Sequence, residues 1–589
     1  TSGRCSYRVK NEGVYEVDLH RKRTYEIEND QLLDFYDSDV VANDALLTKY
    51  LAKNKTAVLG EIIATIQQEQ NAIIRRPPKL NLIVQGVAGS GKTTVAMHRI
   101  SYILYNYEED FRPQDFYIIG SNEILLNYIT SALPDLDVYG VTQMTMEQLF
   151  VRLLYEDWDP IACAVRPVDE AAALKGSSQW FYELQDFCNA YEQAAIPKTE
   201  VRLEKTGVLL MDPAAIDRCI AERRGLSMQE KINMLNAILM SKLENELAGK
   251  YVTYPDQERK ALVRQYRWHF GRNVWKGSIF QVYEEFLETQ AAGGKTVPCT
   301  KNAYDLYDLA ALAYIYKRIK ETDGIREASH VIIDEAQDFG MMAYDVLKYC
   351  LSDCSYTIMG DVSQNIHYGF GLNDWEELKT LMLPSDGSGF CTLKKSYRNT
   401  VEISNFATQI LRHGNFPIYP VEPVIRHGSP VTTLRCSSSE EMLFETEKII
   451  RQWQEEGRET IAVVCRDNEQ AAQVTACLGK KLTLADSDPK TATFTQGIMV
   501  LSVEYTKGLE FDGVVLYDPS AAHYPAEDAS VKLLYVAATR ALHQLAVIHQ
   551  GDLTDLIAKP AHDKKPVTFL EKQDPLPKKA PKLPKTAAG

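Results

Sequence analysis

Long apolar runs and paired cysteines are both missing from this chain of 589 residues. No run approaches the ~18 apolar residues that a helix needs to cross a bilayer, and no secretory leader opens the chain. The eleven cysteines are an odd number and form no Cys-x-x-Cys pair, which argues against a disulfide framework or a structural zinc site. We therefore expect a protein with reduced thiols in the cytoplasm and no membrane partner.

The rest of the composition is ordinary for a globular protein, apart from an excess of acid. Apolar residues make up 45% and charged residues 25% of the chain, both typical values. A chain of this length is expected to hold several domains of ~100–200 residues each. The formal net charge of −15 weakly disfavours a nucleic-acid partner, although an acidic protein can still keep a basic groove.

One stretch, VQGVAGSGKTTVAMHRI at residues 84–100, places three glycines and a lysine between two apolar segments. It fits the pattern of a glycine, four residues, then Gly-Lys-Thr. An apolar run precedes it and apolar residues at helical spacing follow it, so a strand and a helix are predicted on either side. The glycines let backbone N–H groups face phosphate oxygens, and the helix start adds its positive end. We expect a nucleotide here, with Lys92 on the β- and γ-phosphates and Thr93 on Mg²⁺.

The residues expected to bind this nucleotide form the loop itself and the start of the helix. They are Gly86, Val87, Ala88, Gly89, Ser90, Gly91, Lys92, Thr93 and Thr94. The alternative is a glycine turn that holds no ligand, and the complete motif with both of its flanks argues against it.

Two carboxylates end a second apolar strand, HVIIDEAQDF at residues 330–339. Asp334 is placed to hold Mg²⁺, and Glu335 to orient and deprotonate the attacking water. A third strand end, YTIMGDVSQNI, brings Asp361 and Gln364 to the same rim, because ligands of open α/β sheets bind at the carboxyl ends of the strands. A lone Asp-Glu pair would be a solvated strand end, but the glycine loop upstream favours nucleotide hydrolysis.

Phosphoryl transfer also needs positive charge where the transition state builds negative charge, and arginine is the usual source. Arg398 lies in KKSYRNT beside Tyr397, whose ring can stack on a base, and Arg540 lies in LLYVAATRAL. Taken alone, each arginine is more readily explained as a surface or ion-paired side chain.

In their order along the chain these motifs resemble those of superfamily 1 helicases of the UvrD/Rep type. The resemblance covers about residues 60–150 and 300–550 and includes the segments IQQEQNAII, DEAQD, GDVSQ and SVEYTKGLEF. It implies that Gln70 reads adenine, Tyr397 stacks on it and Glu510 contacts the ribose. It also implies ATP and Mg²⁺ as cofactors, Thr93 and Asp334 as metal ligands, and five catalytic residues: Lys92, Glu335, Gln364, Arg398 and Arg540.

The implied fold is an α/β P-loop NTPase with two RecA-like parallel-sheet domains and a mostly helical insertion in the first. Residues 60–150 and 305–390 are expected to form the first domain, 151–304 the insertion and 391–557 the second domain. Before them, 1–59 is expected to form a lead-in of short strands, GVYEVDL and RTYEIEN among them, and then a helix. The tail 558–589, rich in Lys, Pro and Ala, is expected to be disordered.

The positions that grip DNA in UvrD-type enzymes have changed here. Glu147 and Glu504 stand where DNA-facing histidines are expected, and Gly369 stands where an aromatic ring would stack on the strand. The glutamates add negative charge where phosphates would run, and one lost base stack costs ~1–3 kcal/mol. This combination resembles the HelD branch, helicase-IV-like proteins of Gram-positive bacteria that bind RNA polymerase.

Two functions therefore stay open. The HelD resemblance implies a cytoplasmic bacterial motor that uses ATP to remodel or release RNA polymerase and unwinds DNA weakly. It also implies an N-terminal arm that would precede Thr1, so a fragment or a variant without the arm is expected. The alternative is a UvrD-like 3′-to-5′ helicase acting on single-stranded or duplex DNA in repair or replication. RQYRWHFGRNVWKG, residues 264–277, interleaves basic and aromatic residues, as single-strand binding needs, but an amphipathic helix with core aromatics explains it equally well.

Overall fold

The computed structural model of this chain describes most of residues 69–561, together with four short strands that precede them. Its undescribed residues are 1–2, 10–12, 20–22, 29–30, 38–68, 122–125, 127–132, 135–137, 224, 250–252, 323–327, 387, 424–425, 486–496 and 562–589. Nearly all of the tail expected to be disordered thus lies outside the described residues. The chain divides into two compact units, Thr1–Pro77 and Pro78–Gly589.

The first unit contains two antiparallel hairpins. β1 (Gly3–Val9) pairs with β2 (Gly13–Leu19), and β3 (Arg23–Glu28) pairs with β4 (Gln31–Asp37). β2 and β3 lie on the segments GVYEVDL and RTYEIEN, which the sequence predicts as strands. The helix predicted after them, within residues 1–59, lies outside the described residues; the chain is helical at 69–74.

In the second unit, six parallel strands form one sheet in the order β14-β5-β13-β12-β6-β7. Most of these strands are buried along their whole length, because helices cover a parallel sheet on both faces. The chain leaves the sheet after β7 and returns to it at β12, so the intervening residues form an insertion. The strands are β5 (Leu82–Gly86), β6 (Phe116–Gly120), β7 (Thr142–Thr145), β12 (His330–Ile333), β13 (Ser355–Gly360) and β14 (Phe390–Leu393).

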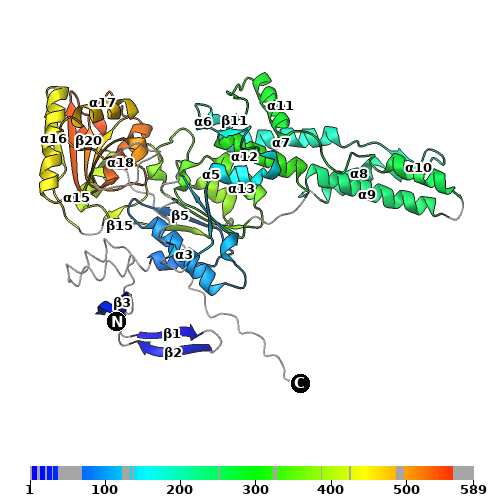
Figure 1. The fold of residues 1–589 in the computed structure, drawn as a ribbon, viewed down its shortest axis with the longest axis horizontal. Coiled ribbons are helices and arrows are strands. Elements are labelled where there is room, and N and C mark those ends of the chain that lie inside the picture. Colours follow the sequence, from blue (N-terminus) through cyan, green and yellow to red (C-terminus); the bar gives the residue numbers. More distant parts are fainter. Residues whose placement is uncertain are drawn as a thin grey trace. The chain divides into compact units, whose positions relative to one another are not determined.

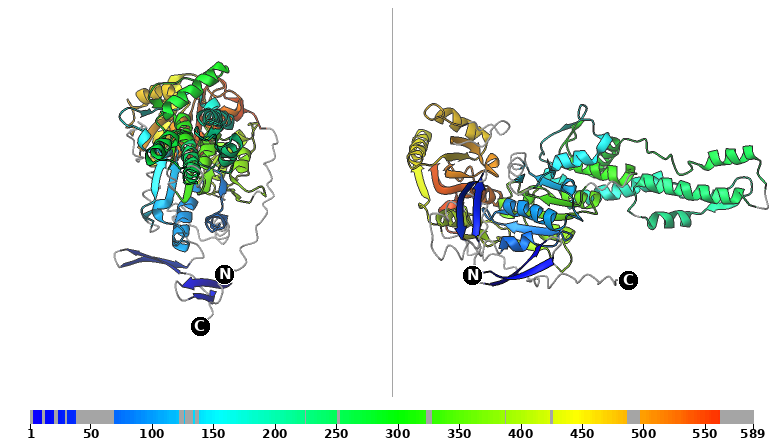
Figure 2. Two further views of the ribbon diagram at one scale, coloured as in Figure 1. Left: turned by 90° about the vertical axis from the view of Figure 1, so that its right-hand side faces the viewer. Right: turned by 60° about the horizontal axis from the view of Figure 1, so that its bottom comes forward.

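The inserted residues are mainly helical, and a single apolar core runs from the sheet into them. In Figures 1 and 2, α8, α9 and α10 run side by side away from β5. We call residues 197–277 the arm; its two ends join α7 and α11. The helices are α5 (Met146–Leu153), α6 (Ala172–Lys175), α7 (Ser178–Ala195), α8 (Pro213–Ala221), α9 (Met228–Leu247), α10 (Asp256–Tyr266), α11 (Ile279–Ala292) and α12 (Leu306–Ile315).

Five parallel strands form the second sheet, in the order β17-β21-β20-β18-β19. Separate apolar cores cover its two faces, as expected for a doubly covered parallel sheet. Its strands are β17 (Thr432–Cys436), β18 (Thr460–Cys465), β19 (Gly497–Ser502), β20 (Phe511–Tyr517) and β21 (Ala541–Gln550). Its helices are α15 (Val401–Leu411), α16 (Ser439–Glu455), α17 (Asn468–Leu478) and α18 (Asp528–Thr539).

Two parallel sheets with helices on their faces confirm the predicted α/β fold class. We refer to the part around the six-stranded sheet, with the insertion, as the first domain and to the part around the five-stranded sheet as the second; the predicted domain boundaries stay predictions. Within the described residues, no helix is long and apolar enough to cross a membrane.

Candidate active site

The loop between β5 and α3 (Lys92–Asn106) requires glycine at several positions. Gly89 and Gly91 have φ angles of 70° and 79°, which side-chain-bearing residues rarely adopt. A Cβ on Gly86 would lie 2.5 Å from Cγ of Lys92, because the lysine packs directly over the loop. Lys92 Nζ donates to the Gly86 carbonyl at 3.0 Å. The loop thus holds a buried ammonium at the first turn of a helix, where a phosphate is favoured.

The threonine and aspartate predicted as metal ligands are in direct contact. Thr93 Oγ1, at the start of α3, donates to Asp334 Oδ2, at the end of β12, at 2.6 Å. Burial and the negative charge of Glu335 raise the pKa of Asp334 to about 6. A cation here would relieve that repulsion, and hydroxyl and carboxylate oxygens are ligands that Mg²⁺ prefers. The residues present therefore fit Mg²⁺, which when bound would neutralise charge on phosphate oxygens.

No protein cluster could hold the metal alone. Among the described residues, no group of three or more His, Cys, Asp or Glu side chains is arranged to bind an ion. Mg²⁺ commonly takes only one or two protein ligands and completes its shell with water and substrate phosphates. The Thr93–Asp334 pair next to a phosphate-binding loop suits that mode of binding.

Glu335 combines a left-handed backbone with a fixed side chain. Its φ is 52°, a strained value for a non-glycine residue. Gln337 Nε2 donates to Glu335 Oε2 at 2.5 Å, and Lys507 Nζ lies 3.9 Å from the same oxygen. Burial would raise the pKa of Glu335, but Lys507 and Lys92 outweigh it and lower that pKa. The carboxylate is held ionised, as a proton acceptor requires.

Lys507 comes from the second domain. It lies in the segment SVEYTKGLEF, and the sequence indicates no role for it. It forms an ion pair with Asp338 in the first domain, four residues after the strand end at Asp334. Lys507 and Gln337 are not among the predicted site residues, although both lie inside motif segments, which is a signal that could have indicated them. What each of them contacts depends on how the two domains meet, which no local pattern indicates.

A buried amide and carboxylate network holds Gln364. Gln364 Nε2 donates to Asp361 Oδ2 at 2.8 Å, and Gln85 Nε2 donates to Asp361 Oδ1 at 2.8 Å. The Asp361 backbone N–H donates to Gln337 Oε1 at 2.8 Å. Asp361 thus accepts from both side-chain amides. The amide oxygen of Gln364 faces the second domain. Sequence reasoning did not assign a role to Gln85; its signal was a polar side chain in an otherwise apolar strand.

Of the two predicted arginines, Arg540 is buried, whereas the Arg398 side chain is 29% exposed and forms an ion pair, as the alternative interpretation expects. Arg540 Nη2 donates to Gln364 Oε1 at 2.5 Å and Arg540 Nε to the Val536 carbonyl at 3.1 Å. Burial lowers the pKa of the Arg540 guanidinium. Arg398 lies over the glycine loop, since a Cβ built on Gly89 would lie 2.9 Å from the Cβ of Arg398.

The remaining predicted contacts are placed differently or stay predictions. Arg398 forms an ion pair with Glu510, so in this structure Glu510 contacts an arginine, and its contact with ribose stays a prediction. The Tyr397 backbone N–H donates to the Gly89 carbonyl at 3.3 Å, which places this tyrosine beside the loop. Gln70 lies in the first compact unit, and its contact with adenine stays a prediction.

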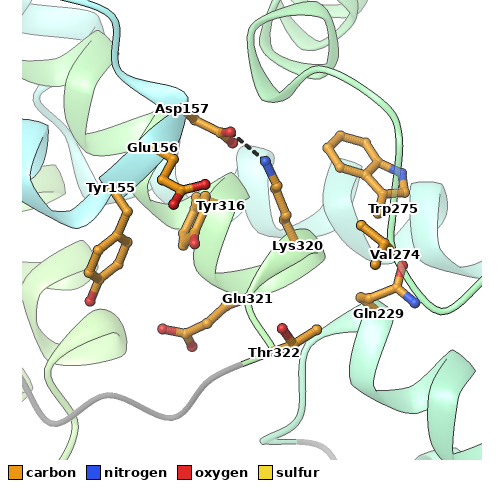
Figure 3. A pocket seen from close by; sticks show the side chains of 10 residues that line it. All are labelled: Tyr155, Glu156, Asp157, Gln229, Val274, Trp275, Tyr316, Lys320, Glu321 and Thr322. Atoms are coloured by element: carbon orange, nitrogen blue, oxygen red, sulfur yellow. Dashed lines mark hydrogen bonds and ion pairs between the residues drawn. The ribbon is translucent and has the colours of Figure 1, made fainter.

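A second cavity, of about 320 Å³, lies at the root of the insertion and not at the glycine loop. Figure 3 shows its side chains, with an ion pair between Lys320 and Asp157. None of the predicted site residues lines it. The cavity is therefore separate from the nucleotide site.

Two family models match the chain. One, described as an AAA domain, matches residues 68–370, just over half of the chain, and the other, a UvrD-like helicase C-terminal domain, matches residues 497–548. A curated relative is the ATP-dependent DNA helicase srs2 of Schizosaccharomyces pombe (strain 972 / ATCC 24843), 30% identical over 356 residues. The aligned region is 59% of this chain and 34% of the relative, so the chain spans about a third of that relative's length.

A solved structure also matches, the C-terminal domain of a possible DNA helicase from Lactobacillus plantarum WCFS1. It is 23% identical, covers 28% of this chain and 95% of that chain, and has a TM-score of 0.24, too low to support an argument. The AAA-domain match contains the glycine loop, Glu335 and Gln364, and the C-terminal match contains Lys507 and Arg540. The chain belongs to the UvrD-like superfamily 1 helicases.

Proposed function

We propose that this motor uses ATP hydrolysis to remodel or release RNA polymerase, and that it unwinds DNA weakly. The observation that carries the proposal is an asymmetry. Lys92, Thr93, Asp334 and Glu335 lie together beside the glycine loop, while the positions expected to grip a DNA strand are acidic, bare or occupied by protein contacts. ATP binding and hydrolysis are thus supported more strongly than strand translocation.

In the proposed hydrolysis step, Lys92 and the loop N–H groups would hold the phosphates, and Thr93 with Asp334 would hold Mg²⁺. Glu335 accepts a proton from the attacking water and stays ionised because Lys507 and Lys92 lower its pKa. Gln364 and the two arginines would stabilise the charge that develops on the transferred group.

The aromatic residues beside Gly369 are engaged within the protein. The Phe370 ring is stacked on His367 with centroids 4.8 Å apart, and it packs edge-on against Tyr307. The Tyr368 hydroxyl donates to Asp528 Oδ2 at 2.9 Å. Neither ring is presented for base stacking in this arrangement, which supports a weak grip on single-stranded DNA.

Two acidic residues add to the same argument. Glu504 is exposed and repels a phosphate backbone that approaches it. Glu147 is half-buried in the first turn of α5, where a negative charge favours the helix end by ~0.3–1 kcal/mol. Glu147 thus has a structural reason to be acidic that a histidine would not satisfy.

A DNA helicase is the second candidate, and two observations favour it. The srs2 relative is named an ATP-dependent DNA helicase. In the basic-aromatic segment, the Trp268 side chain is 42% exposed and the Arg267 guanidinium lies 5.3 Å from its ring centroid. Tyr266 and Phe270 of the same segment are buried, so only part of it is available to stack on bases.

The hydrolysis step is tested by replacing the arginines. Arg398→Ala and Arg540→Ala should each reduce ATP turnover by ~10³-fold if each acts as an engaged arginine finger. Nucleotide affinity should change far less, because the stabilisation is concentrated in the transition state. Near-normal turnover in either variant would remove that arginine from the hydrolysis site.

The target is tested by comparing polymerase co-purification with duplex unwinding for the same protein at physiological salt. We expect RNA polymerase to be retained through the helical insertion, ATPase activity to depend little on single-stranded DNA, and unwinding to be weak. Robust unwinding with no polymerase retained would overturn the proposal and favour the DNA helicase.

A further inference from the structure

A lysine of the second domain, Lys532 in α18, has no exposed surface and reaches into the first domain. Its Nζ donates to the Val362 carbonyl at 2.9 Å and to Asn373 Oδ1 at 2.6 Å. The rings of Phe416 and Tyr368 lie 4.6 and 5.3 Å from the same nitrogen. A buried ammonium is costly unless its donors are used, and here acceptors and aromatic rings surround it.

The two acceptors of Lys532 belong to opposite ends of one loop, residues 362–373. Asn365 Nδ2 donates to Asn373 Oδ1 at 3.0 Å, and Asn373 Nδ2 donates to the Tyr368 carbonyl at 2.8 Å. Asn373 thus closes the loop, and Lys532 fastens the closed loop to α18. Burial lowers the pKa of Lys532 to about 7, despite the opposing attraction of carboxylates on Asp361, Asp528 and Asp374.

The same loop and the same helix also meet at the nucleotide site. Val362 begins the short 3-10 helix that ends at Gln364, and Gln364 accepts from Arg540, the residue that follows the last turn of α18. Lys532 and Arg540 are eight residues apart, about 12 Å along a helix. Residues of α18 and its C-cap therefore contact both ends of the Val362–Gln364 segment: Lys532 contacts Val362, and Arg540 contacts Gln364.

We propose that Lys532 is a positioning residue for ATP hydrolysis, which locks α18 onto the 362–373 loop and thereby holds Arg540 against Gln364. It contacts no substrate. A hydrophobic side chain of similar length would fill the same volume, but it would remove the ammonium that donates to both the Val362 carbonyl and Asn373 Oδ1 and so joins them to α18. The inference rests on the proposed roles of Gln364 and Arg540 in hydrolysis.

The test compares Lys532→Met, Lys532→Arg and a control, Lys448→Met on the exposed face of α16. Lys532→Met should lower kcat about tenfold or more with KM changed less than about threefold, since an interaction that acts in the transition state lowers kcat selectively. Lys532→Arg should recover part of the rate because it restores a donor. Lys448→Met should match the wild type. Wild-type kcat in a folded Lys532→Met protein would overturn the inference, even if its melting temperature fell.

Two further variants keep the test decisive. Asn373→Ala serves if Lys532→Met does not fold. It removes one acceptor and leaves the lysine in place, so it should give the same selective loss of kcat to a smaller extent. Lys532→Met combined with Arg540→Ala should be no slower than Arg540→Ala alone, because the lysine acts through the arginine. Fully additive losses would overturn the inference, whereas normal hydrolysis by Arg540→Ala would instead overturn the proposed site.

Discussion

At the scale of single residues, the site depends on charges that are buried and paired across domains. Glu335 is strained in its backbone and contacts Gln337 from its own domain and Lys507 from the other. Asp334 beside it has a raised pKa, and Glu335 has a lowered one. Two adjacent carboxyl groups thus have different proton affinities, which suits one to a metal ion and the other to a proton transfer.

Glu335→Gln should abolish ATP turnover and preserve ATP binding, because the change removes the proton acceptor and leaves the loop intact. Lys92→Ala should lose turnover and also weaken binding, since its ammonium is part of the phosphate cradle. Steady-state ATPase assays and equilibrium binding of a fluorescent ATP analogue separate the two effects. Turnover at the wild-type rate in Glu335→Gln would show that another group accepts the proton.

We expect the buried His330 to make the stability of the fold sensitive to acid. Its ring nitrogens lie 2.6 Å from Ser355 Oγ and 2.9 Å from Thr357 Oγ1, and burial lowers its pKa from 6.5 to about 3, with Arg99 adding to the shift. The unfolded chain binds the extra proton first, so stability falls as pH drops from 6.5 toward 3, by up to about 1.4 kcal/mol per pH unit.

His330→Asn should therefore lose less stability than the wild type between pH 6.5 and 5, even if it is less stable at pH 7.5. Thermal unfolding midpoints measured across that range for both proteins check this. Equal losses in the two proteins would mean that other groups govern the acid sensitivity.

At the scale of elements, the loop 362–373 is held from both sides. Side chains inside the loop close it, and α18 holds it from outside through Lys532. Gly369 is exposed at its tip, and a Cβ built there would meet no atom within 4 Å. The loop therefore has space for an aromatic ring that the sequence does not supply.

Gly369→Tyr should fold normally and bind single-stranded DNA about tenfold more tightly, since one base stack contributes ~1–3 kcal/mol. Gly225→Tyr is the matched control, because it is also exposed with open space at its Cβ but lies in the arm. Fluorescence anisotropy with a labelled oligonucleotide measures the affinities. The same affinity in Gly369→Tyr, Gly225→Tyr and the wild type would show that no strand passes this loop.

At the scale of the whole molecule, the site is assembled from two domains, and the arm is attached to only one of them. Rings on α7 and α11 pack together, with the centroids of Phe187 and Phe286 5.6 Å apart. Lys295 and Glu183 pair near the far ends of these helices. These contacts show that α7 and α11 are antiparallel. The arm therefore leaves from the C-terminal end of α7 and returns at the N-terminal start of α11. Both of these ends lie away from the Lys295–Glu183 pair.

Replacing the arm, residues 197–277, with a short Gly/Ser linker should leave basal ATPase activity unchanged, because two antiparallel helices can be joined by a short connection. The shortened protein should lose RNA polymerase in co-purification if the arm is the contact surface. ATPase rates and polymerase retention are measured on the shortened and the full chain. Retained polymerase would place the contact elsewhere.

The sequence by itself determined the glycine loop, the strand before it and the helix after it. It also placed Thr93 and Asp334 at one rim, where the structure joins them by a hydrogen bond. These features follow from local physics, since glycine φ angles, apolar runs and helical spacing depend on neighbouring residues. The parallel sheet adds only that strand ends share one edge.

Only the tertiary structure decided which charges meet across the two domains. Lys507 pairs with Asp338 and Lys532 with the loop 362–373 across the two domains, and Arg398 pairs with Glu510 within the second. The residues of each pair are more than a hundred positions apart. A lysine or glutamate in sequence is equally compatible with a solvated surface. Whether it becomes buried and paired depends on the closing of one domain onto the other, because only that removes the water that would otherwise satisfy the charge.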